Sequence, residues 1–175
     1  EEILNEEFEK PFSTLEENIR SIIKIRKLEN DVFVAADPIG IEITFSSSVL
    51  YKSGSAKLME GIKPFLKDVA LLIVDMKYSN ILIEIEGHTD DLPIKTLEYP
   101  SNWELSASRA THVVRFFMRY GIKKQSLKAS GFGDSRPKVP NIVDGRPNRK
   151  NRATNRRMKL SIQRDVYFNV MTKEK

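Results

Sequence analysis

The 175-residue chain contains no cysteine, and this absence removes several kinds of chemistry at once. A disulfide framework, a thiolate nucleophile and a cysteine-bound zinc ion are all excluded. Histidine is scarce: His112 falls in a predicted helix without a nearby partner, and His88 precedes Thr89, Asp90 and Asp91 at the end of a predicted strand. Because a metal site needs three or four converging ligands, this short string is a weak candidate. We expect neither a metal nor a cofactor.

Long hydrophobic runs and catalytic signatures are also missing. The longest apolar run, Val69–Val74, is far shorter than the ~20 residues of a membrane-spanning helix. No Gly-x-Ser-x-Gly elbow occurs, and Gly131-Phe132-Gly133 has the wrong spacing for a phosphate-binding loop and no helix directly after it. The sequence therefore predicts a protein that is not an enzyme.

Charge is present in excess, and it is unevenly placed. The net charge is +5, yet residues 136–159 alone carry nine Lys and Arg against one acid, Asp144. A cationic segment therefore lies on a mildly acidic body. Only Phe132 lies close enough in sequence to stack on a base, so we expect no nucleic-acid partner.

The first thirty residues predict one amphipathic helix. Pro11 is expected to interrupt any earlier helix, and Ser13 with Glu16 has the spacing of an N-terminal capping box. Leu15 and Ile19 begin an apolar stripe over a predicted helix at 14–29. This stripe either packs on its own domain or pairs with a partner helix.

The rest of the chain alternates strand and helix patterns. Period-two alternation predicts strands, and wider apolar faces with capping residues predict helices, the last of these opening at Ser101 with Glu104 and ending before Gly121. The order predicts an α/β fold with a mixed sheet. The expected segments are strands within 32–45, a polar loop at 46–55, a helix after Pro64, a strand at 81–87, a helix from Ser101 to Tyr120, a strand at 127–130, a loop at 131–148 and a strand at 158–163.

Asp90 and Arg109 form the candidate binding pair. Asp90 follows a predicted strand, where ligands commonly bind in α/β folds, and Arg109 lies two turns into the next helix. A carboxylate and a guanidinium placed close together can hold a zwitterion, the first through its ammonium and the second through its carboxylate. An Asp90–Arg109 salt bridge without a ligand is the alternative.

Four motifs follow one another in the order of a known family. Over residues 38–164 they make the chain resemble the OmpA-like peptidoglycan-binding domain. The resemblance implies a two-layer sandwich with helices on one face of the mixed sheet, and binding of the diaminopimelate-containing stem peptide of peptidoglycan. The motifs are Gly87-His88-Thr89-Asp90, Asn102-x-x-Leu105-Ser106-x-x-Arg109-Ala110, Gly131-Phe132-Gly133 and Asn155-Arg156-Arg157.

The resemblance also assigns roles to residues. Asp90 and Arg109 are implied to grip the zwitterionic end of diaminopimelate, in agreement with the charge argument. Neighbouring positions are expected to complete the site: Thr89, Asn102, Leu105 and one or both of Arg156 and Arg157. The stretch 139–154 looks longer and more basic than the usual loop of the family, so it either contacts anionic glycan or is only solvated.

The string Ser101-Asn102-Trp103-Glu104-Leu105-Ser106 resembles the MotB branch of the family, the flagellar motor stator subunits. This branch implies a periplasmic homodimer that anchors the stator to the wall, with an inner-membrane helix upstream of Glu1 that contacts a MotA-type subunit. The start at Glu1 fits a fragment or a processed form. The alternative is a tether of an outer-membrane protein or lipoprotein. The expected organisation is a linker with a helix at 1–30, the OmpA-like domain at 31–165 and a tail at 166–175.

Overall fold

The computed structural model describes residues 2–76 and 80–164, with side chains from residue 11 onward. One five-stranded sheet has the order β1-β2-β7-β3-β4, in which only the β3–β4 pair is parallel. The predicted tail at 166–175 lies outside the described residues. The strands of the sheet are β1 (Val32–Asp37), β2 (Gly40–Ser46), β7 (Arg157–Arg164), β3 (Ile81–His88) and β4 (Leu127–Gly131).

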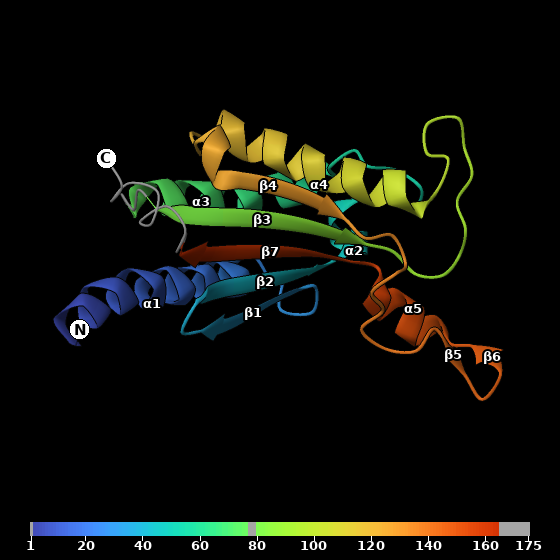
Figure 1. The fold of residues 1–175 in the computed structure, drawn as a ribbon, viewed down its shortest axis with the longest axis horizontal. Helices are drawn as coiled ribbons and strands as arrows, with labels where there is room; N and C mark the ends of the chain where they lie inside the picture. Colours follow the sequence, from blue (N-terminus) through green and yellow to red (C-terminus); the bar gives the residue numbers. More distant parts are fainter. Residues whose placement is uncertain (1, 77–79, 165–175) are drawn as a thin grey trace, which may run out of the picture.

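Helices cover one face of this sheet (Figure 1). The mixed sheet with helices confirms the predicted α/β fold class. The longer helices are α1 (Glu2–Ile25), α3 (Lys63–Asp75) and α4 (Asn102–Arg119), and the shorter ones are α2 (Ser47–Leu50), α5 (Arg149–Asn155) and the 3₁₀ turns η1 (Glu60–Ile62) and η2 (Lys124–Ser126). No helix within the described ranges is long and apolar enough to cross a membrane.

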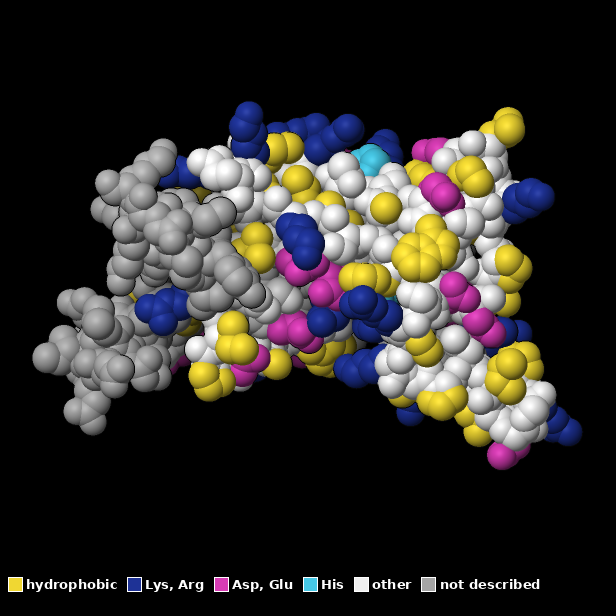
Figure 2. Space-filling view, in the orientation of Figure 1, with side chains coloured by type: hydrophobic (Ala, Val, Ile, Leu, Met, Phe, Trp, Pro, Cys, Tyr) yellow, Lys and Arg dark blue, Asp and Glu magenta, His cyan; other side chains and the backbone are white. Residues whose placement is uncertain are grey.

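The two faces of the sheet differ because successive side chains of a strand point to opposite sides. The helix-covered face buries alternate residues such as Ile43, Ile83 and Leu160 in one continuous core. The opposite face, called the polar face below, carries Glu42 and Lys159 in an ion pair, with further acidic and basic side chains over the strands (Figure 2). The sheet therefore presents one apolar and one charged surface.

Two glycines let α4 lie directly against the sheet. A Cβ atom on Gly87 would come within 2.3 Å of the Ser106 carbonyl oxygen, and one on Gly131 within 2.4 Å of the Ala107 nitrogen. Ser101 accepts a hydrogen bond from the backbone N–H of Trp103, which confirms the predicted N-cap of this helix. The end of β3 and the second turn of α4 are consequently in close contact.

The N-terminal helix differs from the prediction, because α1 continues through Pro11 and through Ser13, which is therefore not an N-cap. A proline inside a helix costs about 3 kcal/mol, mainly through a lost backbone bond and crowding, although its fixed φ is itself helical. Burial of Leu15 and Ile19 on the same helix contributes a stabilisation of similar size. The apolar stripe packs on the chain's own core, which is the first of the two alternatives.

Two segments expected to be loops contain regular structure. The short helix α2 occupies part of 46–55, and Tyr51 after it is buried, because this segment folds over α4. The stretch 131–148 contains the hairpin of β5 (Ile142–Val143) and β6 (Arg146–Pro147), which together with α5 projects from the end of the sheet where β3 stops (Figure 1). We call residues 136–155 the arm.

Candidate functional site

A polar pocket of about 490 Å³ lies at the C-terminal end of β3. The segment after β3 contributes Thr89 and Asp90, and α4 contributes Leu105 and Arg109. Arg156 lines it from the end of α5. We call this cavity the Arg109 pocket. It brings together five of the seven residues expected from the sequence.

Asp90 is buried at the floor of the loop that follows β3. One carboxylate oxygen, Oδ1, accepts a hydrogen bond from the backbone N–H of Leu92 at 3.0 Å. The other, Oδ2, is 2.5 Å from Nη1 of Arg156. The carboxylate is thus fixed in position, and its charge is matched by a guanidinium whose side chain is 43% exposed.

Arg109 is buried too, but it makes no ion pair with any described residue. Its Nε donates to the carbonyl of Ser55 at 2.9 Å, Nη1 to the hydroxyl of Ser47 at 3.1 Å and Nη2 to the carbonyl of Lys52 at 3.3 Å. The expected alternative, a salt bridge between Asp90 and Arg109, is wrong, because Asp90 pairs with Arg156 instead. A guanidinium has five N–H donors, so one remains on each terminal nitrogen of Arg109.

Burial dominates the electrostatics around Arg109. It lowers the pKa of Arg109, because the charged form loses its hydration. Burial likewise raises the pKa of Tyr51, whose ring lies 4.9 Å from Cζ of Arg109. Tyr51 therefore stays neutral, and its hydroxyl donates to the backbone carbonyl of Arg109 at 2.8 Å. The cation is held by neutral groups, and its charge remains available to an anion.

Apolar and backbone contacts complete the pocket walls. Leu105 packs with Ala56 and Tyr99 in a small buried cluster beside the cavity. The Thr89 hydroxyl donates to the carbonyl of Asp90 at 2.9 Å, and the Thr89 N–H donates to the carbonyl of Gly133 at 2.8 Å. These contacts give the loop after β3 a defined shape, so Asp90 is positioned before any ligand arrives.

The motif serine of α4 fixes the neighbouring glycine loop. Ser106 is fully buried, and its hydroxyl accepts a hydrogen bond from the backbone N–H of Gly133 at 3.0 Å. The Phe132 N–H donates to the carbonyl of Gly87 at 3.0 Å. Ser106 and the Gly131–Gly133 motif therefore hold α4 against the sheet and do not line the pocket.

Asn102 and Arg157 are not among the residues that line the pocket. The side-chain amide of Asn102 donates to the carbonyl of Leu92 at 2.9 Å, so it shapes the loop from behind. Arg157 begins β7 and lies on the polar face, where its Nη1 and Nη2 donate to the carbonyls of Asn155 and Arg136. The two consecutive arginines of the motif thus serve opposite sides of the sheet.

The arm is joined to the pocket loop by an ion pair that the sequence analysis did not foresee. Arg152 contacts both carboxylate oxygens of Asp91, at 2.6 and 3.0 Å. This hydrogen-bonded partner holds the pKa of Asp91 below its usual range. One cation of the basic segment is thereby neutralised, and α5 is fixed next to the Arg109 pocket.

Sequence reasoning also missed the residues that hold Arg109. Ser47, Tyr51, Lys52 and Ser55 all belong to the segment predicted as a polar loop. The isolated aromatic Tyr51 within this polar stretch was the one available signal that it folds back onto the protein.

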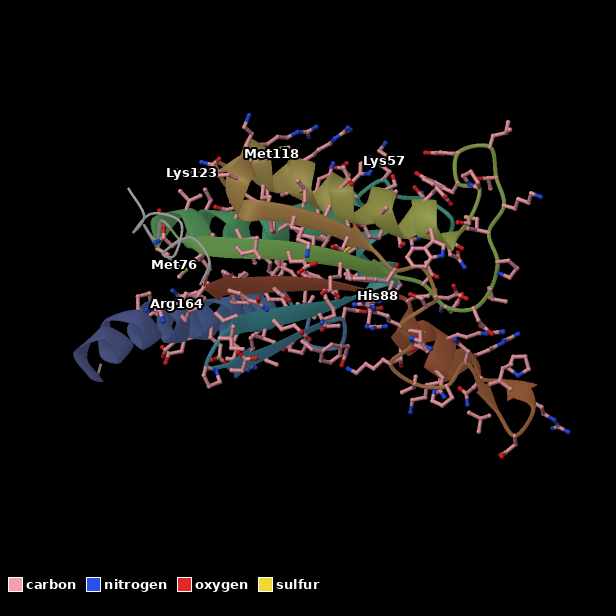
Figure 3. All side chains as sticks on the ribbon, viewed as in Figure 1. Lys57, Met76, His88, Met118, Lys123 and Arg164 are labelled. Carbon is pink, nitrogen blue, oxygen red and sulfur yellow. The ribbon has the colours of Figure 1, made fainter. Side chains whose placement is uncertain are left out.

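Neither histidine forms part of a metal site in the described residues, where no group of three potential ligands converges. His88 is buried, its Nε2 lies 3.1 Å from Oε2 of Glu86, and its ring stacks on Phe132. Figure 3 labels His88 at the end of the sheet near the arm, far from Met76 and Lys123. His112 contacts the backbone carbonyl of Ser108 within its own helix.

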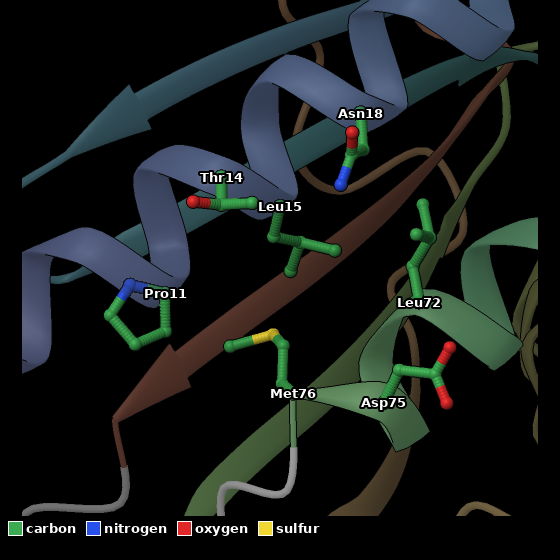
Figure 4. A pocket seen from close by; sticks show the side chains of 7 residues that line it. All are labelled: Pro11, Thr14, Leu15, Asn18, Leu72, Asp75 and Met76. Atoms are coloured by element: carbon green, nitrogen blue, oxygen red, sulfur yellow. The ribbon is translucent and has the colours of Figure 1, made fainter.

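A hollow of about 530 Å³ between α1 and α3 provides a contrast (Figure 4). Its described lining includes Pro11, Leu15, Leu72 and Met76, with Asp75 at one side. No described residue that lines it is cationic, so it lacks the pair of opposite charges found in the Arg109 pocket. Size alone therefore does not select the candidate site.

The structure is thus an α/β module with a preformed, charged pocket at the end of a mixed sheet. Residues 50–156 match the OmpA family, and the chain belongs to that family. It is 31% identical over 151 residues to motility protein B of Bacillus subtilis (strain 168), an alignment that covers 83% of this chain and 55% of that relative. The chain thus spans about half the length of this relative.

Solved structures agree with this family assignment. A putative MotB-like protein from Desulfovibrio vulgaris superposes with a TM-score of 0.75 at 28% identity, covering 92% of this chain and 99% of that one. The cell wall anchor of the T6SS from Pseudomonas aeruginosa gives 0.70 at 26% identity, with 83% and 96% covered. The predicted membership of the OmpA-like family, with its MotB-like character, is confirmed.

Proposed function

We propose that this chain is a non-catalytic module that binds peptidoglycan by holding the zwitterionic end of a diaminopimelate stem peptide in the Arg109 pocket. The supporting observation is the state of Arg109, a buried cation without a carboxylate partner in the described chain. A ligand carboxylate would supply the missing charge through the two remaining N–H donors, one on each terminal nitrogen.

Asp90 would receive the ammonium group of the same ligand. Its carboxylate already accepts one hydrogen bond from a backbone N–H and makes one contact with Arg156. The exposed guanidinium of Arg156 can also bind the ligand's carboxylate. The pocket then holds one carboxylate and two guanidinium groups, which matches a ligand with one ammonium and a carboxylate on the same carbon. Thr89 and Leu105 shape the wall on either side.

Binding to purified diaminopimelate-type sacculi tests this assignment. We expect Arg109→Ala and Asp90→Asn each to weaken binding at least tenfold, because a charge-assisted hydrogen bond contributes roughly 1.5–3 kcal/mol. Arg119→Ala, which removes an exposed arginine from the same helix, is the matched control and should bind like the parent. Circular dichroism checks that each variant is folded. Normal binding by folded Arg109→Ala would refute the site.

We further infer that the module anchors flagellar stator units to the wall from the periplasm. The similarity to motility protein B and to a MotB-like structure supports this role. In it, the full-length protein has an inner-membrane helix upstream of Glu1, meets a MotA-type subunit through that helix and acts as a homodimer.

The second candidate function is a tether of an outer-membrane protein or lipoprotein. The similarity to the cell wall anchor of the T6SS supports this candidate, because that protein is not part of a flagellar motor. Replacing the matching part of a motility protein B with this chain separates the two. Restored swimming that depends on Arg109 supports the stator role. Sacculus binding without restored swimming supports the tether.

A further inference from the structure

A second concavity, of about 410 Å³, lies on the polar face between the start of the sheet and the arm. The strands β1 and β2 form one wall, and α5 with the chain before it forms the other. We call it the Arg157 groove. The side chains that matter here are Phe33, Thr44, Ser46, Lys138, Lys150 and Arg157.

Arg157 is a partly buried cation that makes no ion pair with any described acid. Its two terminal nitrogens each donate to a backbone carbonyl, of Asn155 at 3.2 Å and of Arg136 at 3.1 Å. Three of its five N–H donors therefore make no hydrogen bond within the described chain. Burial lowers its pKa, because the charge has lost hydration, and the charges of Glu86 and Glu42 oppose this shift only in part. An anion in the groove would compensate this loss.

The groove has no acidic side chain among its described lining residues, whereas it has three basic ones. Lys138 and Lys150 are exposed and make no ion pair in the described part of the chain. Two more exposed cations, Arg146 and Arg149, continue along the arm and make no ion pair with a described residue. Basic side chains on the projecting arm are visible in Figure 2. The positive charge therefore extends from the Arg157 groove along the arm.

The arm that carries these cations is held in a fixed shape. Asn155 is fully buried, and its oxygen accepts hydrogen bonds from the backbone N–H groups of Lys138 and Val139, at 2.8 and 3.1 Å. Its amide nitrogen donates to the carbonyl of Val139 and to the side chain of Asn141. The spacing of the cations is thus a property of the fold.

We propose that the Arg157 groove and the adjoining arm bind the phosphodiester backbone of an anionic cell-wall polymer. A row of separate cations suits a chain of repeated negative charges better than one small anion, and both Lys and Arg contact phosphate well. The choice of a wall polymer rests on the proposed function. The Arg109 pocket lies on the other side of α5 and β7, so a module bound to peptidoglycan through that pocket would hold the groove close to the wall. Phe33 is the one exposed aromatic side chain among the described lining residues, which is little for stacking nucleic-acid bases.

Titration of the whole chain with poly(glycerol phosphate) at low salt tests the proposal. We expect Lys138→Gln/Lys150→Gln to weaken binding about fivefold, since each exposed charge contact contributes modestly. Lys123→Gln/Lys124→Gln removes the same charge at the far end of the sheet and should bind like the parent (Figure 3). Arg157→Gln should weaken binding more than tenfold. Binding by the parent should also weaken as salt is raised.

Two results would overturn this inference. One is polymer binding that is absent, or that the lysine pair in the groove affects no more than the control pair does. The other is duplex DNA that binds as tightly as the polymer and loses as much affinity in the same variants. Polymer binding that persists in Arg109→Ala supports a separate site. If stem-peptide fragments fail to bind the parent while the polymer still binds through Lys138 and Lys150, the proposed function fails and the anion groove stands.

Discussion

The Arg109 pocket and the Arg157 groove contain the same kind of group in different surroundings. Each holds an arginine that is partly or fully buried, anchored on backbone carbonyls and without an ion pair in the described chain. Across the pocket lies the carboxylate of Asp90, whereas the lining of the groove adds two lysines and no acid. The neighbours therefore determine the ligand: opposite charges together suit a zwitterion, and like charges in a row suit a polyanion.

The largest effect that separates the two regions is expected from Gly87→Ala. The added Cβ would lie 2.3 Å from the Ser106 carbonyl, so α4 must move away from β3. We expect a loss of about 3 kcal/mol in the free energy of unfolding. Binding of the stem peptide should also be lost, because Arg109 moves with α4. The groove does not include α4, so polymer binding by the folded fraction should persist.

Gly61→Ala is the matched control for this prediction, because a Cβ there has no atom within 4 Å. Its unfolding free energy, from urea denaturation, should lie within about 0.5 kcal/mol of the parent. A Gly87→Ala protein as stable as Gly61→Ala would show that the close approach of α4 and β3 is unimportant.

Asn155→Ala should have the next largest effect and should harm both regions. Removing its side chain leaves the backbone N–H groups of Lys138 and Val139 without their acceptor, at an expected cost of about 2–3 kcal/mol. Both binding activities should weaken, because the arm lies beside the pocket and the groove alike. Asn151→Ala loses the exposed side-chain hydrogen bond to the Pro140 carbonyl but keeps the backbone N–H bond to Asn148, so it should cost less than about 1 kcal/mol. Selective loss of one activity would contradict this shared role.

The smallest effect is expected from Glu86→Gln on the polar face. The hydrogen bond from His88 holds the pKa of Glu86 below its ordinary value of 4.5. A lowered pKa in the folded state stabilises the protein above pH 4.5, and this contribution disappears as the pH falls through the lowered value. The variant should therefore lose less than about 1 kcal/mol at neutral pH.

The measurement is urea denaturation between neutral pH and about pH 3, where the unfolding free energy of Glu86→Gln should fall less steeply than that of the parent below pH 4.5. Glu29→Gln, which removes an exposed carboxylate elsewhere, controls for the change in net charge. Because the charge of Glu86 partly offsets that of Arg157, we also expect slightly tighter polymer binding in Glu86→Gln. Parent-like pH dependence would show that the contact with His88 contributes nothing to stability.

Much of this arrangement could be predicted from the sequence because it depends on near neighbours. Period-two alternation located β2, β3 and β7, and the Ser101 cap located the start of α4. The order of the motifs placed Asp90 and Arg109 at one end of the sheet, where they do line one pocket. Pro11 misled the same kind of reasoning, since burial further along α1 outweighs a local rule.

The sequence by itself determined the strands of the five-stranded sheet, the capped helix, the family and the charged residues of the candidate site, since periodicity and motif order are properties of neighbouring residues. Only the tertiary structure decided the partners. Asp90 pairs with Arg156, sixty-six residues away, and Arg109 is held by the segment around Ser47 to Ser55, more than fifty residues before it. Arg156 and Arg157 are adjacent in the chain yet serve opposite sides of the sheet. Such pairings depend on how distant segments are packed together, which no local pattern records.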